Sequence, residues 1–262
     1  MKALITGASS GIGEALAYEL SKRGYDLVLV ATDLKKLEHV SKNCKTKTRV
    51  IPCDLKNTNA IYDLYDLVKE EDIDLLINNA GFGLFGFFDK TELTRELEMI
   101  DVNIRAVHIL TKLFLKDFVA KDNGRILNVA SSAGFMAGPK LSTYYATKNY
   151  VLRLSQAIYE ELRHQKSNVK ISVLCPGPVN TNFNKVAKGK FNIKGADKNY
   201  VAKYTVDKMF KNKLIIIPTL KMKLAIFGSR LIPSKLLLKI TYRIQDKKLR
   251  DKSLKNSAKS RQ

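Results

Sequence analysis

Short apolar runs alternate along the chain with stretches in which apolar residues recur at a helical spacing. Apolar runs of about four to eight residues bounded by turn residues are typical of buried strands, and the helical spacing is typical of amphipathic helices. Regular alternation of the two predicts a doubly wound parallel sheet flanked by helices. The expected strands are Lys2–Thr6, Asp26–Val30, Arg49–Pro52, Ile73–Asn79, Gly124–Ser131, Val169–Cys175 and Leu214–Ile217, and the expected helices span 11–23, 33–43, 56–70, 92–121, 143–166 and 197–212.

No internal repeat or low-complexity linker interrupts this alternation before residue 218. At 262 residues the chain has a length that one α/β domain commonly reaches undivided. Residues 1–218 are therefore expected to form a single Rossmann-like domain around a seven-stranded sheet.

Beyond Pro218 the pattern changes, and residues 219–262 are expected to form a basic amphipathic extension. The segment up to Ile232 is loosely amphipathic, and Pro233-Ser234 predicts the start of a second helix with Ser234 available as an N-cap. The polar residues from Arg250 onward are expected to be disordered. One face of the second helix carries Leu236, Leu237, Ile240 and Ile244, and the other carries Lys235, Lys239 and Arg243.

The net charge of +21 is unevenly distributed along the chain. Residues 188–262 hold 21 of the 46 basic residues and 4 of the 25 acidic ones, which is a net of +17 and leaves +4 for residues 1–187. No aromatic stacking motif or recognition module accompanies the basic residues, so binding to nucleic acid is not expected. The positive charge either serves binding or simply reflects a lysine-rich composition, and the sequence supports both explanations equally.

Cysteine usage and hydropathy indicate the compartment. The three cysteines are an odd number without ligand-like spacing, so neither a disulfide framework nor a metal site is expected. The first strand begins within two residues of Met1, so no signal peptide is expected. No uncharged apolar run reaches the roughly 18 residues of a membrane span. We expect a cytoplasmic protein, or one bound peripherally at the inner membrane surface.

A glycine-rich turn follows the first strand and leads into the first helix. Glycine permits a tight turn and lets a pyrophosphate approach the main chain, and the free N–H groups at the helix start attract an anion. The alternative is a purely structural strand-to-helix turn. The spacing is G-x-x-x-G-x-G, in the segment Thr6-Gly7-Ala8-Ser9-Ser10-Gly11-Ile12-Gly13.

Three further segments fit a dinucleotide at the carboxyl edge of the sheet, where open α/β folds bind ligands. Asp54, in Cys53-Asp54-Leu55, ends the third strand and is placed to accept a hydrogen bond from an adenine amino group; the alternative is an N-cap for the next helix. Small residues in Asn78-Asn79-Ala80-Gly81 let the backbone meet the cofactor. Pro176-Gly177-Pro178-Val179-Asn180-Thr181 follows the sixth strand.

The end of the second strand bears on the choice of cofactor. Enzymes that use NAD usually place an acid there, which binds the ribose 2′-hydroxyl and repels a 2′-phosphate. Ala31 and Thr32 occupy this position, and Lys35 and Lys36 follow Asp33. The sequence therefore favours NADP, with NAD as the alternative.

A phenol and an ammonium one helical turn apart suggest carbonyl chemistry. Four pairs in the chain match Y-x-x-x-K, so the spacing alone is uninformative: Tyr18/Lys22, Tyr65/Lys69, Tyr144/Lys148 and Tyr204/Lys208. Only Tyr144 has a hydroxyl residue thirteen positions upstream, Ser131, which lies at the end of a predicted strand. Tyr144, Lys148 and Ser131 are therefore the candidate catalytic group, and Ser132 replaces Ser131 if the strand register differs.

These motifs together resemble the short-chain dehydrogenase/reductase family in its shorter form. The resemblance implies a nicotinamide cofactor, a homodimer or homotetramer, and a substrate-covering segment at residues 182–212. It covers most of the chain up to Thr181. The matching positions are Thr6-Gly-x-x-x-Gly11-x-Gly13, Asp54, Asn78-Asn-Ala-Gly81, Asn103, Ser131, Tyr144-x-x-x-Lys148 and Pro176-Gly177.

The resemblance also implies a role for each residue. Tyr144 would exchange a proton with the carbonyl oxygen, Lys148 would favour the phenolate and bind the ribose, and Ser131 would orient the substrate. Asn103 would hold a water that relays protons to Lys148, and Thr181 would hold the carboxamide. The expected cofactor contacts are Gly7, Ser9, Ser10, Gly11, Ile12, Gly13, Thr32, Asp54, Leu55, Asn79, Ala80, Gly81, Tyr144, Lys148, Pro176, Gly177, Val179 and Thr181.

The sequence thus predicts an oxidoreductase that interconverts a secondary alcohol and a ketone or lipid-like 3-oxoacyl compound, with NADPH favoured. Apolar residues of Gly81–Phe88, together with Phe135 and Met136, are expected to line the substrate pocket or to pack in the core. A catalytically silent NADP-binding regulator is the alternative. The basic extension suggests a lipid reductase at a membrane surface, or else a helix that packs on the domain or a neighbouring subunit.

Overall fold

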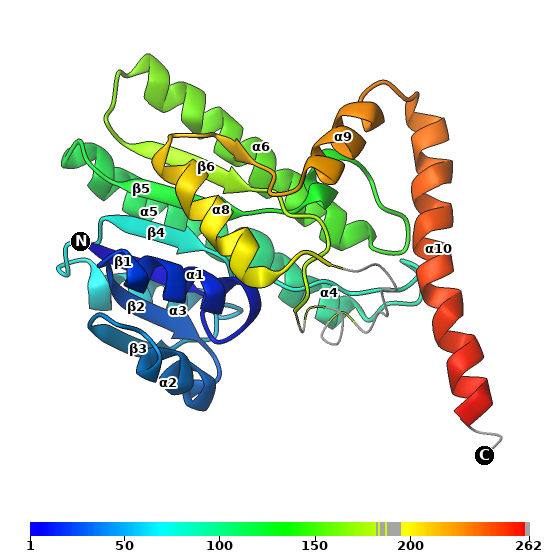
Figure 1. Cartoon of the computed structure of the whole chain (residues 1–262), viewed down its shortest axis with the longest axis horizontal. Helices are drawn as coiled ribbons and strands as arrows, with labels where there is room; N and C mark the ends of the chain where they lie inside the picture. Colours follow the sequence, from blue (N-terminus) through cyan, green and yellow to red (C-terminus); the bar gives the residue numbers. More distant parts are fainter. Residues whose placement is uncertain (182, 184–186, 188–194, 260–262) are drawn as a thin grey trace.

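A single parallel sheet of seven strands organises the molecule, in the order β3-β2-β1-β4-β5-β6-β7 (Figure 1). The computed structural model describes residues 1–181, 183, 187 and 195–259, with side chains described as far as residue 246. The order reverses direction between β1 and β4, as expected of a doubly wound sheet. The strands are β1 (Lys2–Thr6), β2 (Asp26–Ala31), β3 (Thr48–Pro52), β4 (Leu75–Asn78), β5 (Arg125–Val129), β6 (Lys170–Leu174) and β7 (Ile215–Ile216).

Helices cover both faces of the sheet, which confirms the expected fold class. On one face α1 (Gly11–Lys22), α2 (Leu34–Lys42) and α8 (Lys198–Phe210) pack over the strands. On the other face lie α3 (Thr58–Val68), α5 (Val107–Ala120) and α6 (Ser142–His164). The helix α4 (Leu93–Ile100) leads into α5.

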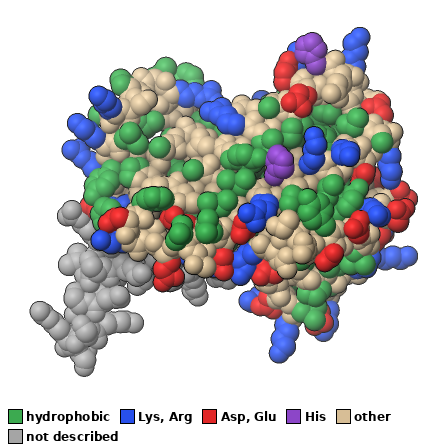
Figure 2. Space-filling view, turned by 180° about the vertical axis from the view of Figure 1, so that it is seen from behind, with side chains coloured by type: hydrophobic (Ala, Val, Ile, Leu, Met, Phe, Trp, Pro, Cys, Tyr) green, Lys and Arg blue, Asp and Glu red, His purple; other side chains and the backbone are tan. Residues whose placement is uncertain are grey.

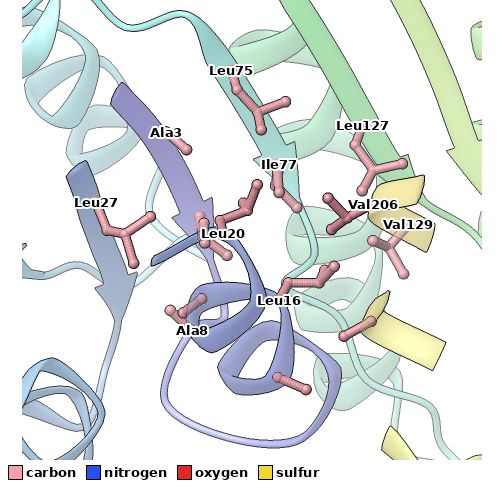
Figure 3. Packing of buried hydrophobic residues seen from close by; sticks show 14 of the residues in the cluster. Ala3, Ala8, Leu16, Leu20, Leu27, Leu75, Ile77, Leu127, Val129 and Val206 are labelled. Carbon is pink, nitrogen blue, oxygen red and sulfur yellow. The ribbon is translucent and has the colours of Figure 1, made fainter. Parts of the chain in front are cut away.

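The core beneath α1 shows why the alternating sequence folds in this way. Leu16 and Leu20 of α1 have no exposed surface and point at the sheet, where side chains of four neighbouring strands meet them (Figure 3). Parallel strands are buried on both faces, which is why they appear in the sequence as continuous apolar runs. The strand side chains labelled there are Ala3, Leu27, Leu75, Ile77, Leu127 and Val129.

The segment 92–121 departs from the single α-helix that its sequence predicts. It forms α4 and α5 joined by a π-helical stretch, η1 (Asp101–Ala106), without a break in the chain's helical path. A π turn admits an extra residue into a helix and is common at functional sites. Asn103 lies within it.

Two helices follow the sheet domain, α9 (Leu220–Ser229) and α10 (Ser234–Lys259). α10 stands at one end of the molecule, beyond the carboxyl edge of the strands (Figure 1). It begins at Ser234 as expected, but it continues as helix to Lys259, so the expectation of disorder from Arg250 is wrong over that range. None of the helices in the described part of the chain has the length and apolarity to cross a membrane.

Candidate active site

The glycine-rich turn is tied to the end of β4 by side-chain hydrogen bonds. Thr6 Oγ1 accepts hydrogen bonds from the backbone N–H groups of Asn79, at 3.0 Å, and Ala80, at 3.1 Å. In return, Asn79 Nδ2 donates to the carbonyl oxygens of Thr6, at 3.0 Å, and Gly7, at 3.1 Å. Because β1 and β4 are neighbours in the sheet, these bonds hold two motifs far apart in sequence in one fixed arrangement.

No side chain larger than hydrogen fits at two positions of this turn. A Cβ on Gly13 would lie 2.3 Å from the Gly7 carbonyl oxygen, and a Cβ on Gly7 would lie 2.8 Å from Ala80 Cα. Gly7 and Gly11 also have φ near +65°, a conformation that glycine adopts without strain. At the N-cap of α1, the Ser10 side chain makes no capping hydrogen bond. The first N–H groups of α1 are thus available to an anion. This glycine-rich turn with the start of α1, which we call the cradle, fits a pyrophosphate.

Asp54 and Leu55 lie at the end of β3. The Asp54 carboxylate is exposed, accepts the Lys56 backbone N–H at 3.1 Å and lies 3.4 Å from Lys56 Nζ. The following helix is capped by Asn57, so the alternative reading of Asp54 as that helix's N-cap is wrong. Leu55 turns its side chain into the core.

Thr32 is exposed immediately after β2. Asp33, the next residue, is the N-cap of α2 and accepts hydrogen bonds from Lys36 N at 3.1 Å and Lys36 Nζ at 2.6 Å. The hydrogen bond from the Lys36 side chain is the main cause that lowers the pKa of Asp33. Lys36 is therefore already paired with a carboxylate, while Lys35 is exposed.

The candidate catalytic side chains come together behind this turn. Lys148, buried on α6, donates from Nζ to the Val129 carbonyl oxygen at 2.9 Å, and the same Nζ lies 5.9 Å from the centroid of the Tyr144 ring. Ser131 follows β5, and its hydroxyl lies close enough to the Tyr144 phenol to lower the pKa of that phenol. Ser131, and not the alternative Ser132, is therefore the serine at the phenol.

Burial favours the neutral form of both titrating groups. Desolvation raises the pKa of Tyr144 to about 12, against a smaller lowering by the hydrogen bond to Ser131. Desolvation also lowers the pKa of Lys148 to about 8. A buried cation beside a buried phenol can stabilise the phenolate that forms when the phenol gives up its proton.

Asn103 joins three elements through its side-chain amide. Its Nδ2 donates to the Phe82 carbonyl oxygen at 2.9 Å and to Thr147 Oγ1 at 3.0 Å, and its Oδ1 accepts the Phe82 N–H at 3.1 Å. A Cβ on Gly81 would lie 2.9 Å from Asn103 Oδ1 and 3.1 Å from Lys148 Nζ. Thr147 and Phe82 were not predicted as partners, and no local pattern distinguishes them.

The loop after β6 completes the mouth of the site. The Pro176 carbonyl oxygen accepts the Ser132 N–H at 2.8 Å, and Val179 pairs with Ala196. A Cβ on Gly11 would lie 3.4 Å from the Thr181 methyl carbon, so the glycine-rich turn and Thr181 face each other closely. A Cβ on Gly177 would lie 2.6 Å from Met222 Cε, which shows how tightly α9 packs on this loop.

The expected substrate-covering segment, 182–212, lies partly outside the described residues, which omit 182, 184–186 and 188–194. Its later part forms α8, which packs against α1 on the sheet. Phe183, in contrast, lies beside the phenol, with ring centroids 5.4 Å apart. An apolar cluster around Tyr144 contains Phe85, Leu141, Tyr145, Phe183 and Ala187. Phe135 packs in the core instead, and Phe87 and Phe88 are exposed.

α10 also contacts this region, which the sequence did not predict. Gln245 Nε2 donates to the Tyr145 hydroxyl at 2.7 Å, and Asp246 forms an ion pair with the buried Lys140. The Tyr145 ring meets the Tyr144 ring edge to face, with centroids 6.2 Å apart. The Tyr145 side chain thus connects α10 to Tyr144, the candidate acid.

Known proteins resemble this chain in sequence and in fold. The profile of the short chain dehydrogenase family matches residues 1–190. The very-long-chain 3-oxoacyl-CoA reductase of Homo sapiens is 34% identical over 194 residues, which are 71% of this chain and 62% of that protein. An uncharacterized oxidoreductase of Staphylococcus epidermidis is 32% identical over 181 residues, which are 68% of this chain and 78% of that protein. This chain thus spans less than two thirds of the reductase.

Among solved structures, a short-chain dehydrogenase from Sphingobium yanoikuyae in complex with NADPH superposes with a TM-score of 0.79. It is 28% identical, and the match covers 88% of this chain and 93% of that one. The chain therefore belongs to the short-chain dehydrogenase/reductase family and is an oxidoreductase.

Proposed function

We propose that the protein reduces a ketone, of the 3-oxoacyl or a similar lipid-like class, to a secondary alcohol with NADPH. The observation that carries this proposal is the meeting of Tyr144, Lys148 and Ser131 behind the glycine-rich turn. When bound, the nicotinamide cofactor supplies the hydride for the carbonyl carbon. Because all three side chains are present together, the alternative of a silent NADP-binding regulator is not favoured.

Within this proposal Tyr144 is the general acid. Its hydroxyl donates a proton to the carbonyl oxygen as that oxygen gains negative charge, and the Lys148 ammonium stabilises the resulting phenolate. The Ser131 hydroxyl donates to the same carbonyl oxygen and orients it. Asn103 holds Phe82 and α6 in register, so that the site keeps its shape around Lys148.

The residues around the cradle support NADPH over NADH. The tip of β2 presents the Thr32 hydroxyl and Lys35, and the nearest acid, Asp33, is neutralised by Lys36. A 2′-phosphate at this tip would meet no unpaired carboxylate of β2 or of the start of α2. The related structure from Sphingobium yanoikuyae contains NADPH, which adds support.

Two observations support a 3-oxoacyl or similar apolar ketone. The cluster around Tyr144 is aromatic and aliphatic, so it suits an apolar chain next to the carbonyl. The human relative is named for a 3-oxoacyl-CoA substrate, although this chain matches only 62% of its length.

The experiment follows cofactor oxidation at 340 nm with a panel of ketones, 3-oxoacyl thioesters, steroids and quinones, each with NADPH and NADH. We expect turnover of a 3-oxoacyl thioester or bulky ketone, with NADPH preferred. Thr32→Asp, which places a carboxylate at the tip of β2, should shift that preference toward NADH. Absence of turnover with every carbonyl compound and both cofactors would contradict the proposal.

Gly13→Ala should weaken cofactor binding and lower thermal stability together. The new Cβ would collide with the Gly7 carbonyl oxygen at 2.3 Å, and overpacking of this kind costs about 1–3 kcal/mol. If the cradle bears that cost, the Kd for NADPH rises about five- to 150-fold. Fluorescence titration with NADPH measures the effect, and Gly228→Ala is the control because nothing lies within 4 Å of its added Cβ. Equal affinity of the two variants would show that the cradle is not the binding site.

A further inference from the structure

α9 and the first turns of α10 expose an apolar surface that the sheet domain does not cover. On α9 and the loop after it, Leu220, Leu224, Phe227 and Leu231 recur at helical spacing and are each 64–73% exposed. On α10, Leu236, Ile240 and Ile244 form a second ridge and are 36–52% exposed. We call these seven side chains the outer face.

The packing of α10 is inverted relative to an ordinary amphipathic helix. Among its side chains described, from Ser234 to Asp246, the most buried are polar: Thr241 is 5% exposed and Gln245 is 2% exposed. The expected apolar face therefore turns outward, except for Leu237, which is half-buried. A continuous exposed apolar ridge is costly in water, and such surfaces mark contacts with a partner or a membrane.

The charges around the outer face are almost all positive. Between residues 219 and 246 the only acidic residue is Asp246, and it is paired with Lys140. Basic and hydrophobic side chains lie side by side over this part of the molecule, at the upper left of Figure 2. The basic residues are Lys221, Lys223, Arg230, Lys235, Lys239 and Arg243.

We propose that the outer face binds the surface of an anionic lipid bilayer. Leucine, isoleucine and phenylalanine side chains would enter the boundary between headgroups and acyl chains, while the flanking lysines and arginines attract the anionic headgroups. A second copy of the chain fits less well, because two outer faces would bring like charges together with no acid to offset them.

The contacts of α10 connect this surface to the active site. Gln245 and Asp246 fasten the inner side of the helix to Tyr145 and Lys140, and the Lys140 ammonium also lies 4.5 Å from the Phe87 ring centroid. A membrane under the outer face would therefore be separated by α10 from the apolar cluster around Tyr144. The inference that lipid-derived substrates enter from the bilayer rests on the proposed function. The proposed binding to lipid does not rest on it.

The test is co-sedimentation of the full chain with phosphatidylcholine vesicles, with and without phosphatidylglycerol, at low and high salt. The protein should bind the phosphatidylglycerol vesicles, and high salt should weaken the binding. The triple variant Leu224→Ser, Phe227→Ser and Leu231→Ser should bind at least tenfold more weakly. The matched control is Leu67→Ser with Leu93→Ser, which alters leucines 51% and 69% exposed on or beside other helices of the sheet domain.

Three results would overturn the proposal: no binding of the protein to anionic vesicles, undiminished binding by the triple variant, or an equal loss in the control. Light scattering tests whether a second copy of the chain covers the outer face instead. If the triple variant no longer forms a dimer but binds vesicles as before, the outer face is a dimer contact. Turnover of a water-soluble ketone should be the same in the triple variant. That assay separates the two proposals, since catalysis without vesicle binding refutes only the membrane surface, and vesicle binding without catalysis refutes only the proposed reaction.

Discussion

Replacement of Tyr144 by phenylalanine should lower kcat for carbonyl reduction by about 100- to 10,000-fold, the range in which positioned acids contribute. The variant keeps the ring that packs against Phe183 and Tyr145 and loses only the hydroxyl that Ser131 contacts. Because the ring stays, NADPH affinity and thermal stability should be close to those of the unmodified protein. Steady-state NADPH oxidation and a fluorescence titration together measure the two effects.

Tyr204→Phe is the matched control for this prediction. Tyr204, on α8, precedes Lys208 with the same spacing, but its hydroxyl accepts a hydrogen bond from Lys223 at 3.0 Å. It should keep full activity. If Tyr144→Phe also keeps it, the phenol is not the acid and the proposed mechanism fails.

Lys148→Met should lower kcat strongly while making the protein more stable at neutral pH. Removal of a preorganised charge at a reacting group costs about 100- to 1,000-fold in kcat. Burial lowers the pKa of Lys148 from its ordinary value of 10.5 to about 8, which corresponds to a cost of about 3 kcal/mol for holding the charge at pH 7. After the lost hydrogen bond to Val129 is deducted, the gain in unfolding free energy is about 2 kcal/mol.

The pH dependence of that gain has a definite sign. The pKa of Lys148 is lower in the folded protein than in the unfolded chain, so between pH 8 and 10.5 the unfolded state holds the additional proton. Stability attributable to this group therefore rises with pH across that window, and below pH 8 the full cost applies. Urea unfolding of both proteins at pH 7 and pH 9.5 should show the advantage of Lys148→Met shrinking at the higher pH. An advantage that grows with pH would contradict the assignment.

Much of the fold was readable from the sequence because the local signals are strong. All seven expected strands are present: β1 has the expected bounds, β2 and β3 are each one residue longer, and the other four are one or two residues shorter at each end, as at Leu75–Asn78 and Ile215–Ile216. The π turn at Asp101–Ala106 was not readable, because one inserted residue leaves the apolar spacing of a long helix almost unchanged. The hydrogen-bond partners of Asn103 were not predicted, because Phe82 and Thr147 lie 21 and 44 positions away from it in the sequence.

The sequence by itself determined the alternating architecture and the position of the glycine-rich turn, because backbone preference and burial act over a few neighbouring residues. It also singled out Tyr144 among four equally spaced pairs through Ser131. Only the tertiary structure decided which face of α10 turns inward. That choice depends on Tyr145, which lies 100 positions before Gln245 and offers its hydroxyl to it. Hydrogen-bond and charge partners brought together by the fold here outweighed the apolar pattern of the helix itself.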